Sequence, residues 1–115
     1  MSDNIDSGLV LAEFIELRKK MGDRIYMLRD KFVENTHMLI NETEVAINEC
    51  DIAKLVSNAH TLKGSSAAMS ARKLANLAQQ LESNATLEDW QHMQLIMSDL
   101  KKEFQAVIQN LNRLL

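Results

Sequence analysis

The chain has 115 residues, of which 46% are apolar, so it is long enough for one hydrophobic core and too apolar for global disorder. Its formal net charge of −3 argues against nucleic acid as the main partner. Its single cysteine, Cys50, excludes an internal disulfide and a cysteine-based zinc site. The first residues lack a signal segment, and no apolar stretch approaches the roughly 20 residues that a membrane span requires. We therefore expect a soluble protein of a reducing cytoplasm, and Met1 at the start favours a free-standing protein.

The composition predicts an all-α fold. The chain contains no proline and only three glycines, and these two residue types are the strongest breakers of regular structure. Leucine, alanine, methionine, lysine, glutamate and glutamine, which all favour helix, are plentiful. We expect one domain over residues 1–115, with residues 1–8 as a flexible N-terminus.

Five helices can be drawn in chain order from apolar spacing and capping residues. The first runs over residues 9–21, the second ends near residue 49 and the third ends near residue 68. The fourth stops before the break at residues 84–85, and the fifth continues to the end of the chain. The predicted caps are Ser7 and Gly22 for the first helix, Asp23, Asp51 and Ser70 at the starts of the next three, and a Thr86–Asp89 capping box before the fifth.

Each predicted helix carries an apolar stripe, and the stripe of the fifth is the clearest. Its residues are spaced alternately by three and four, as the seam of an antiparallel bundle requires. Short connections between long helices make neighbours antiparallel, so helices two to five should form an up-down-up-down four-helix bundle with the first helix packed across one end. A coiled-coil dimer is an alternative, but four helices can cover the stripe within one chain, and we expect a monomer. The stripe of the second helix reads Ile25, Leu28, Phe32, Thr36, Leu39, Thr43 and Ala46; the third contributes Leu55, Ala59 and Leu62; the fourth contributes Leu74, Leu77, Ala78 and Leu81; and the fifth reads Trp90, Met93, Met97, Leu100, Phe104, Val107, Leu111 and Leu114.

The segment that carries chemistry begins at His60 on the third predicted helix. Residues three and four apart share a helix face, so Lys63 and Gly64 lie beside His60, while Leu62 points toward the core. An imidazole nitrogen is a competent nucleophile near neutral pH, and a lysine one turn away would neutralise charge on a phosphoryl group. Glycine inside a helix costs about 0.5–1 kcal/mol relative to alanine, which suggests that something must approach the backbone closely. For the other two histidines, His37 and His92, an ordinary structural role is favoured.

The run from His60 to Ser66, HTLKGSS, resembles the signature H-x-L-K-G-[SA]-[SA] of histidine-containing phosphotransfer domains. The similarity extends over most of the chain, from about Leu9 to the end. It includes Phe32 on the second predicted helix, the pattern ending at Glu82 and the final amphipathic helix. One departure is Ser70, where the family often has glycine. Because serine is a good N-cap, we expect the turn to form nevertheless.

The resemblance implies a role for each residue of the site. His60 would accept the phosphoryl group on Nε2, Lys63 would stabilise it, and Glu82 would accept a hydrogen bond from Nδ1 and fix the tautomer. Gly64 and Ala67 would belong to the surface on which a receiver domain docks. The implied partners are response-regulator receiver domains and a hybrid sensor histidine kinase, with no nucleic acid and no membrane. No cofactor is expected, and any Mg²⁺ would belong to the receiver.

The function implied by the resemblance is a relay, in which a receiver aspartate passes a phosphoryl group to His60 and a second receiver takes it on. The chain lacks a glycine-rich phosphate loop, so we expect no kinase or ATPase activity of its own. One alternative is the phosphoacceptor domain of a sensor or chemotaxis kinase. The sensor-kinase form usually has an acidic residue and a proline after its histidine, whereas Thr61 follows here. A second alternative is a non-catalytic helical adaptor in which His60 is incidental.

Overall fold

The computed structural model describes residues 7–115, and this part of the chain consists of helices and short turns, without a β-strand. The predicted all-α class is therefore confirmed. None of the described helices is both long and apolar enough to cross a membrane. The helices are α1 (Leu11–Met21), α2 (Arg24–Asn48), α3 (Ile52–Ala68), α4 (Arg72–Ala85) and α5 (Trp90–Leu114).

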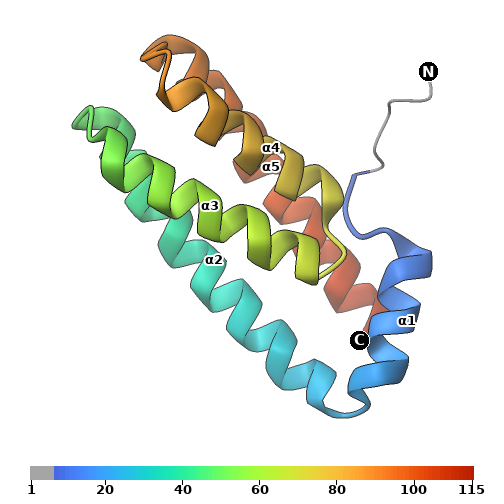
Figure 1. Cartoon of the computed structure of the whole chain (residues 1–115). Helices are drawn as coiled ribbons and strands as arrows, with labels where there is room; N and C mark the ends of the chain where they lie inside the picture. Colours follow the sequence, from blue (N-terminus) through green and yellow to red (C-terminus); the bar gives the residue numbers. More distant parts are fainter. Residues whose placement is uncertain (1–6) are drawn as a thin grey trace.

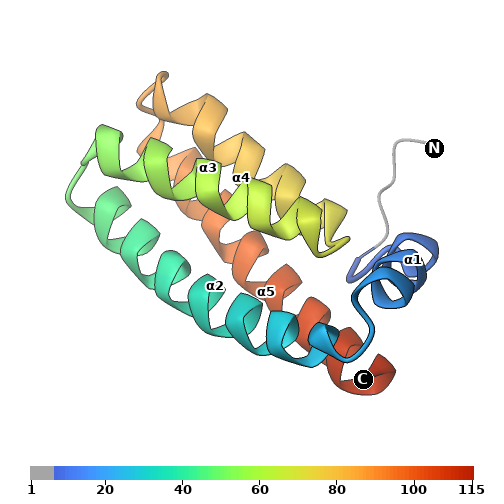
Figure 2. The ribbon, with the colours of Figure 1, turned by 60° about the horizontal axis from the view of Figure 1, so that its bottom comes forward.

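The helices α2 to α5 form the predicted antiparallel bundle, and α1 lies across the end that carries the C-terminus (Figure 1). The turned view shows the same arrangement, with α1 at one end of the bundle formed by α2 to α5 (Figure 2). The Arg18 guanidinium donates a hydrogen bond to the Leu114 carbonyl, which ties α1 to the end of α5. Short turns allow only antiparallel neighbours, so the connections alone account for this topology.

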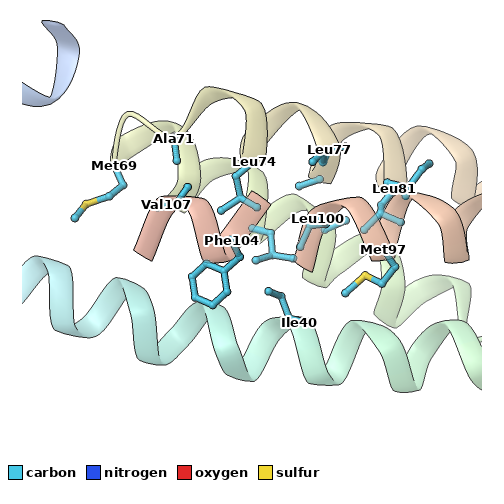
Figure 3. Close-up of a cluster of buried hydrophobic side chains, with 14 of the residues drawn as sticks. Ile40, Met69, Ala71, Leu74, Leu77, Leu81, Met97, Leu100, Phe104 and Val107 are labelled. Atoms are coloured by element: carbon cyan, nitrogen blue, oxygen red, sulfur yellow. The ribbon is translucent and has the colours of Figure 1, made fainter. Parts of the chain in front are cut away.

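The core follows the axis of the bundle, and its centre is built from leucines of α4 and α5 and from Phe104 of α5, which pack over α2 (Figure 3). The predicted stripes of α3, α4 and α5 are confirmed, except that Trp90 and Leu114 at the ends of α5 are only partly buried. Phe32 and Phe104 meet edge to face, with ring centroids 6.3 Å apart, which joins α2 to α5.

The predicted stripe of α2 needs a correction. Leu28 and Leu39 are only partly buried, whereas Ile40 and Ile47 lie in the core at 5% and 3% exposure. After Thr36 the buried positions Ile40, Thr43 and Ile47 follow at steps of four, three and four residues. The sequence allowed either step, and only the positions of α3 and α5 decide which leucine or isoleucine faces inward.

Two turns share one design, the Schellman motif, in which a residue with positive φ follows the helix end. At the end of α3, the Ser70 amide donates to the Ala67 carbonyl and the Ala71 amide donates to the Ser66 carbonyl, with Ser70 at φ 66°. The turn after α2 repeats this geometry, with Cys50 at φ 54°. This position favours glycine because a side chain is strained there. Ser70 is therefore a helix-ending residue, and the predicted N-cap role is wrong, since α4 starts at Arg72.

The other caps are partly as predicted. Asp51 accepts a hydrogen bond from the Lys54 amide, and Gly22 ends α1 at φ 57°. The predicted capping box before α5 is wrong, because Asp89 is itself the cap and accepts from the His92 amide. Asp23 holds the predicted position before α2 but makes no capping hydrogen bond with its side chain.

The segment before α1 is attached to α5, and Ser7 does not cap α1 as predicted. The Ser7 hydroxyl and the Gly8 amide both donate to the Glu103 carboxylate, which is only 4% exposed. The Leu9 amide donates to Asn110, and α1 begins at Leu11 without a side-chain cap. Of the N-terminus predicted to be flexible, residues 1–6 lie outside the described part.

Candidate functional site

His60 projects from the middle of α3 into solvent. Its side chain is 69% exposed, whereas Ala59 and Leu62 on either side are completely buried. The helix therefore presents the imidazole beside the core stripe and outside it, as the sequence predicts. A ring this exposed can be reached by a second protein.

Glu82 on α4 meets the imidazole from the neighbouring helix. Its Oε2 atom lies 3.2 Å from His60 Nδ1. A carboxylate can only accept a hydrogen bond, so Nδ1 carries the proton in this contact. In a neutral ring the lone pair then sits on Nε2, the nitrogen on the far side of the ring from Glu82.

Lys63 lies one turn beyond His60 and binds the same carboxylate. Its Nζ atom lies 3.0 Å from Glu82 Oε1 and 2.8 Å from Gln79 Oε1. Because α3 and α4 are antiparallel, three residues forward on α3 correspond to three residues back on α4. The pairing of His60 with Glu82 therefore places Gln79 opposite Lys63.

Lys63 and His60 both lower the pKa of the Glu82 carboxyl. The hydrogen bond from Lys63 lowers the pKa of the Glu82 carboxyl, and the charge of Lys63 and the contact with His60 lower it further. Partial burial opposes this shift, but it does not cancel it. Glu82 is consequently ionised throughout the pH range in which a histidine titrates.

Gly64 and Ala67 are exposed on α3 beside this site. A Cβ atom added at Gly64 would meet nothing within 4 Å in this chain. The packing of the protein itself therefore gives no reason for a glycine at this position. Any requirement for it must come from a molecule that approaches α3 from outside.

Two hollows flank the exposed face of α3. One, of about 320 Å³, lies between α3 and α4 and includes Lys63 and Gln79. The other, of about 290 Å³, lies between α2 and α3 and is mostly apolar. The second hollow is lined by Leu28, Lys31, Phe32, Asn35, Thr36, Ser65, Ala68 and Met69.

The sequence missed Gln79 as a member of the site. The signal was available, since Gln79 precedes Glu82 by three residues and thus shares its face of α4. The remaining histidines stand elsewhere: His37 packs edge-on against Phe104 at 5.0 Å, and His92 is exposed in the first turn of α5. Residues 7–115 contain no group of three or more histidine, cysteine or acidic side chains able to hold a metal.

Comparisons with known proteins agree on one family. The family model of the Hpt domain matches residues 27–113, a range that contains His60, Lys63 and Glu82 and leaves out α1. The crystal structure of histidine-containing phosphotransfer protein B (HptB) from Pseudomonas aeruginosa PAO1 matches with a TM-score of 0.78 and 28% sequence identity, over 82% of each chain. A search of curated proteins finds no match.

We predict that Lys63→Met raises the pKa of Glu82, because the ammonium is the main cause of its lowering and burial acts in the opposite direction. In the wild type, the ionised carboxylate stabilises the fold above the ordinary pKa of a glutamate, and this contribution is lost as the pH falls through the lowered pKa of the folded state. The change is measured by NMR titration of the Glu82 side-chain carboxyl carbon. Lys54→Met, an exposed lysine on the same helix, is the control, and equal midpoints in the wild type and Lys63→Met would contradict the assigned cause.

Proposed function

This chain belongs to the Hpt domain family of histidine phosphotransfer proteins, and from that premise we propose that His60 is the residue that carries the phosphoryl group. Proteins with this role are relay intermediates of two-component signalling. The observation that carries the assignment is the exposed imidazole with its Nδ1 held by Glu82 at 3.2 Å. That contact leaves Nε2 as the nucleophile, because a protonated nitrogen has no lone pair to attack with.

The transfer follows from this tautomer. A receiver domain presents its phosphoaspartate, and Nε2 attacks the phosphorus in line with the bond to the aspartate oxygen. The N–P bond forms as the O–P bond breaks, and the receiver carboxylate leaves. The imidazole gains positive charge in this step, and Glu82 beside Nδ1 stabilises it. Transfer to the second receiver reverses the same events.

Lys63 supplies charge to the phosphoryl group. Phosphoryl transfer depends chiefly on positioning and on neutralising the charge of the phosphoryl oxygens. The Lys63 ammonium has three protons, and two of them are directed to Glu82 and Gln79. The third is available to an oxygen of the group carried on Nε2.

The docking surface that we propose includes Gly64, Ala67 and the mostly apolar hollow between α2 and α3. Small residues on α3 leave the backbone close to the partner, and Leu28 and Phe32 supply apolar surface beside it. The partners are receiver domains of response regulators and a hybrid sensor histidine kinase, with the chain acting as a cytoplasmic monomer. The protein needs no cofactor of its own in this mechanism, and any Mg²⁺ belongs to the receiver.

The proposal is tested by incubating the chain with phosphorylated receiver domains of its source cell. We expect an acid-labile, base-stable label on the wild-type protein and none on His60→Gln. The variants His37→Gln and His92→Gln are matched controls and should be labelled like the wild type. Labelling that persists in His60→Gln would place the acceptor elsewhere, and a wild type that no receiver labels would favour the adaptor function.

We predict that Gly64→Ala separates stability from transfer. The new methyl group meets nothing within 4 Å, so the free energy of unfolding should rise by about 0.5–1 kcal/mol from the helix propensity of alanine. Transfer from a receiver domain should slow, because the methyl group projects into the docking surface. Urea unfolding measures the change in stability, and phosphoryl labelling quenched at a series of times measures the transfer rate. A variant that is more stable and transfers at the wild-type rate would show that Gly64 does not face the partner.

A further inference from the structure

The side-chain oxygen of Gln79 is the second acceptor that holds the Lys63 ammonium. The proposed transfer mechanism gives Gln79 no role. The distance from Lys63 Nζ to Gln79 Oε1 is 2.8 Å, shorter than the 3.0 Å to Glu82 Oε1. Gln79 is itself exposed, and it lines the hollow between α3 and α4 together with Lys63. Lys63 is therefore fixed to α4 at two points.

The orientation of the Gln79 amide is determined by its neighbours. A lysine ammonium can only donate hydrogen bonds, so Gln79 must turn its carbonyl oxygen toward Lys63. Its amide nitrogen then faces away and donates to the Ser83 hydroxyl at 3.0 Å. Ser83 lies one turn further along α4, so this bond holds the Gln79 side chain along its own helix. The resulting chain of contacts runs from Ser83 through Gln79, Lys63 and Glu82 to His60.

We propose that Gln79 is a positioning residue that holds the Lys63 ammonium where it meets a phosphoryl group on His60. The proposal rests on the phosphoacceptor role of His60 and the stabilising role of Lys63 proposed above. Lysine has four rotatable side-chain bonds, and a single contact with Glu82 leaves the ammonium free to swing about that oxygen. The second contact removes this freedom before the phosphoryl group arrives.

The neutrality of Gln79 matters as much as its oxygen. A carboxylate at this position would cancel the charge of Lys63 and repel the phosphoryl oxygens. The amide fixes the ammonium without adding a negative charge to the site. Glu82 contributes one negative charge already, and it shares that charge between Lys63 and His60.

Phosphoramidate, used as the donor, tests this arrangement without a docking partner. In the labelling step, His60 Nε2 attacks phosphorus, the N–P bond to the imidazole forms, and the bond to the donor nitrogen breaks. The leaving nitrogen takes a proton from water and departs as ammonia. The rate of this step reports on the site residues alone.

The test variant is Gln79→Met, which keeps the length of the side chain and removes the acceptor. We expect labelling of His60 to slow about threefold to tenfold, the effect of one lost hydrogen bond in the transition state. Gln80→Met is the matched control, since it changes the next glutamine of α4, which is also exposed, and it should be labelled at the wild-type rate. The thermal midpoint of unfolding should be the same in all three proteins, because both glutamines are exposed.

Two further readouts separate positioning from other roles. The ¹⁵N–¹H signal of the Lys63 ammonium should be visible in the wild type and broadened by proton exchange in Gln79→Met. In a Lys63→Met background, Gln79→Met should cause no additional loss, because its effect passes through the ammonium.

Three results would overturn the proposal: equal labelling rates in Gln79→Met and Gln80→Met, faster labelling in Gln79→Met, or losses that add in the double variant. A wild type that phosphoramidate labels only at residues other than His60, or not at all, would instead contradict the phosphoacceptor assignment on which the proposal rests.

Discussion

The Glu82 carboxylate is shared between two groups of the neighbouring helix, with Oε2 on His60 Nδ1 and Oε1 on Lys63 Nζ. In the relay role that we propose for His60 and Lys63, one acidic side chain thereby sets both the tautomer of the nucleophile and the place of the charge that stabilises the phosphoryl group. Neither task requires Glu82 to touch the phosphoryl group. Both tasks require that α3 and α4 keep one fixed register, because a shift of one residue along either helix would break both contacts of Glu82.

That register is a property of the fold. The contact between α3 and α4 is the most extensive between any two helices of the described part, and Ala59 and Ala78 are completely buried. Small side chains let the helix axes approach closely, so that Glu82 reaches across. The Schellman turn at Ser70 fixes the offset, and the Val10 amide donates to the Ser70 carbonyl from the segment before α1. The strained φ of Ser70 is held in place by contacts from both sides.

Much of this could be read from the sequence, and the limits have physical causes. The stripes of α3, α4 and α5 and the exposure of His60 follow from helix periodicity, which is a local property. The choice of Ile40 over Leu39 depends on where two other helices lie, and periodicity alone cannot decide it. The role of Glu103 depends on contacts between segments far apart in the sequence. Gln79 could have been placed beside Glu82 from their spacing, but its contact with Lys63 follows only from the register of α3 and α4. Ser7 and Asp89 show the same limit for caps, since a capping side chain is identified by the amide it reaches and several nearby residues could reach one.

We infer that Glu82 holds the proton of the neutral His60 ring on Nδ1 and leaves Nε2 free. Long-range ¹H–¹⁵N NMR correlation of the imidazole, recorded above the pH at which the ring loses its charge, measures this directly. We expect a protonated Nδ1 and an unprotonated Nε2 in the wild type, and a mixture of tautomers in Glu82→Ala. A wild-type ring with its proton mainly on Nε2 would contradict it.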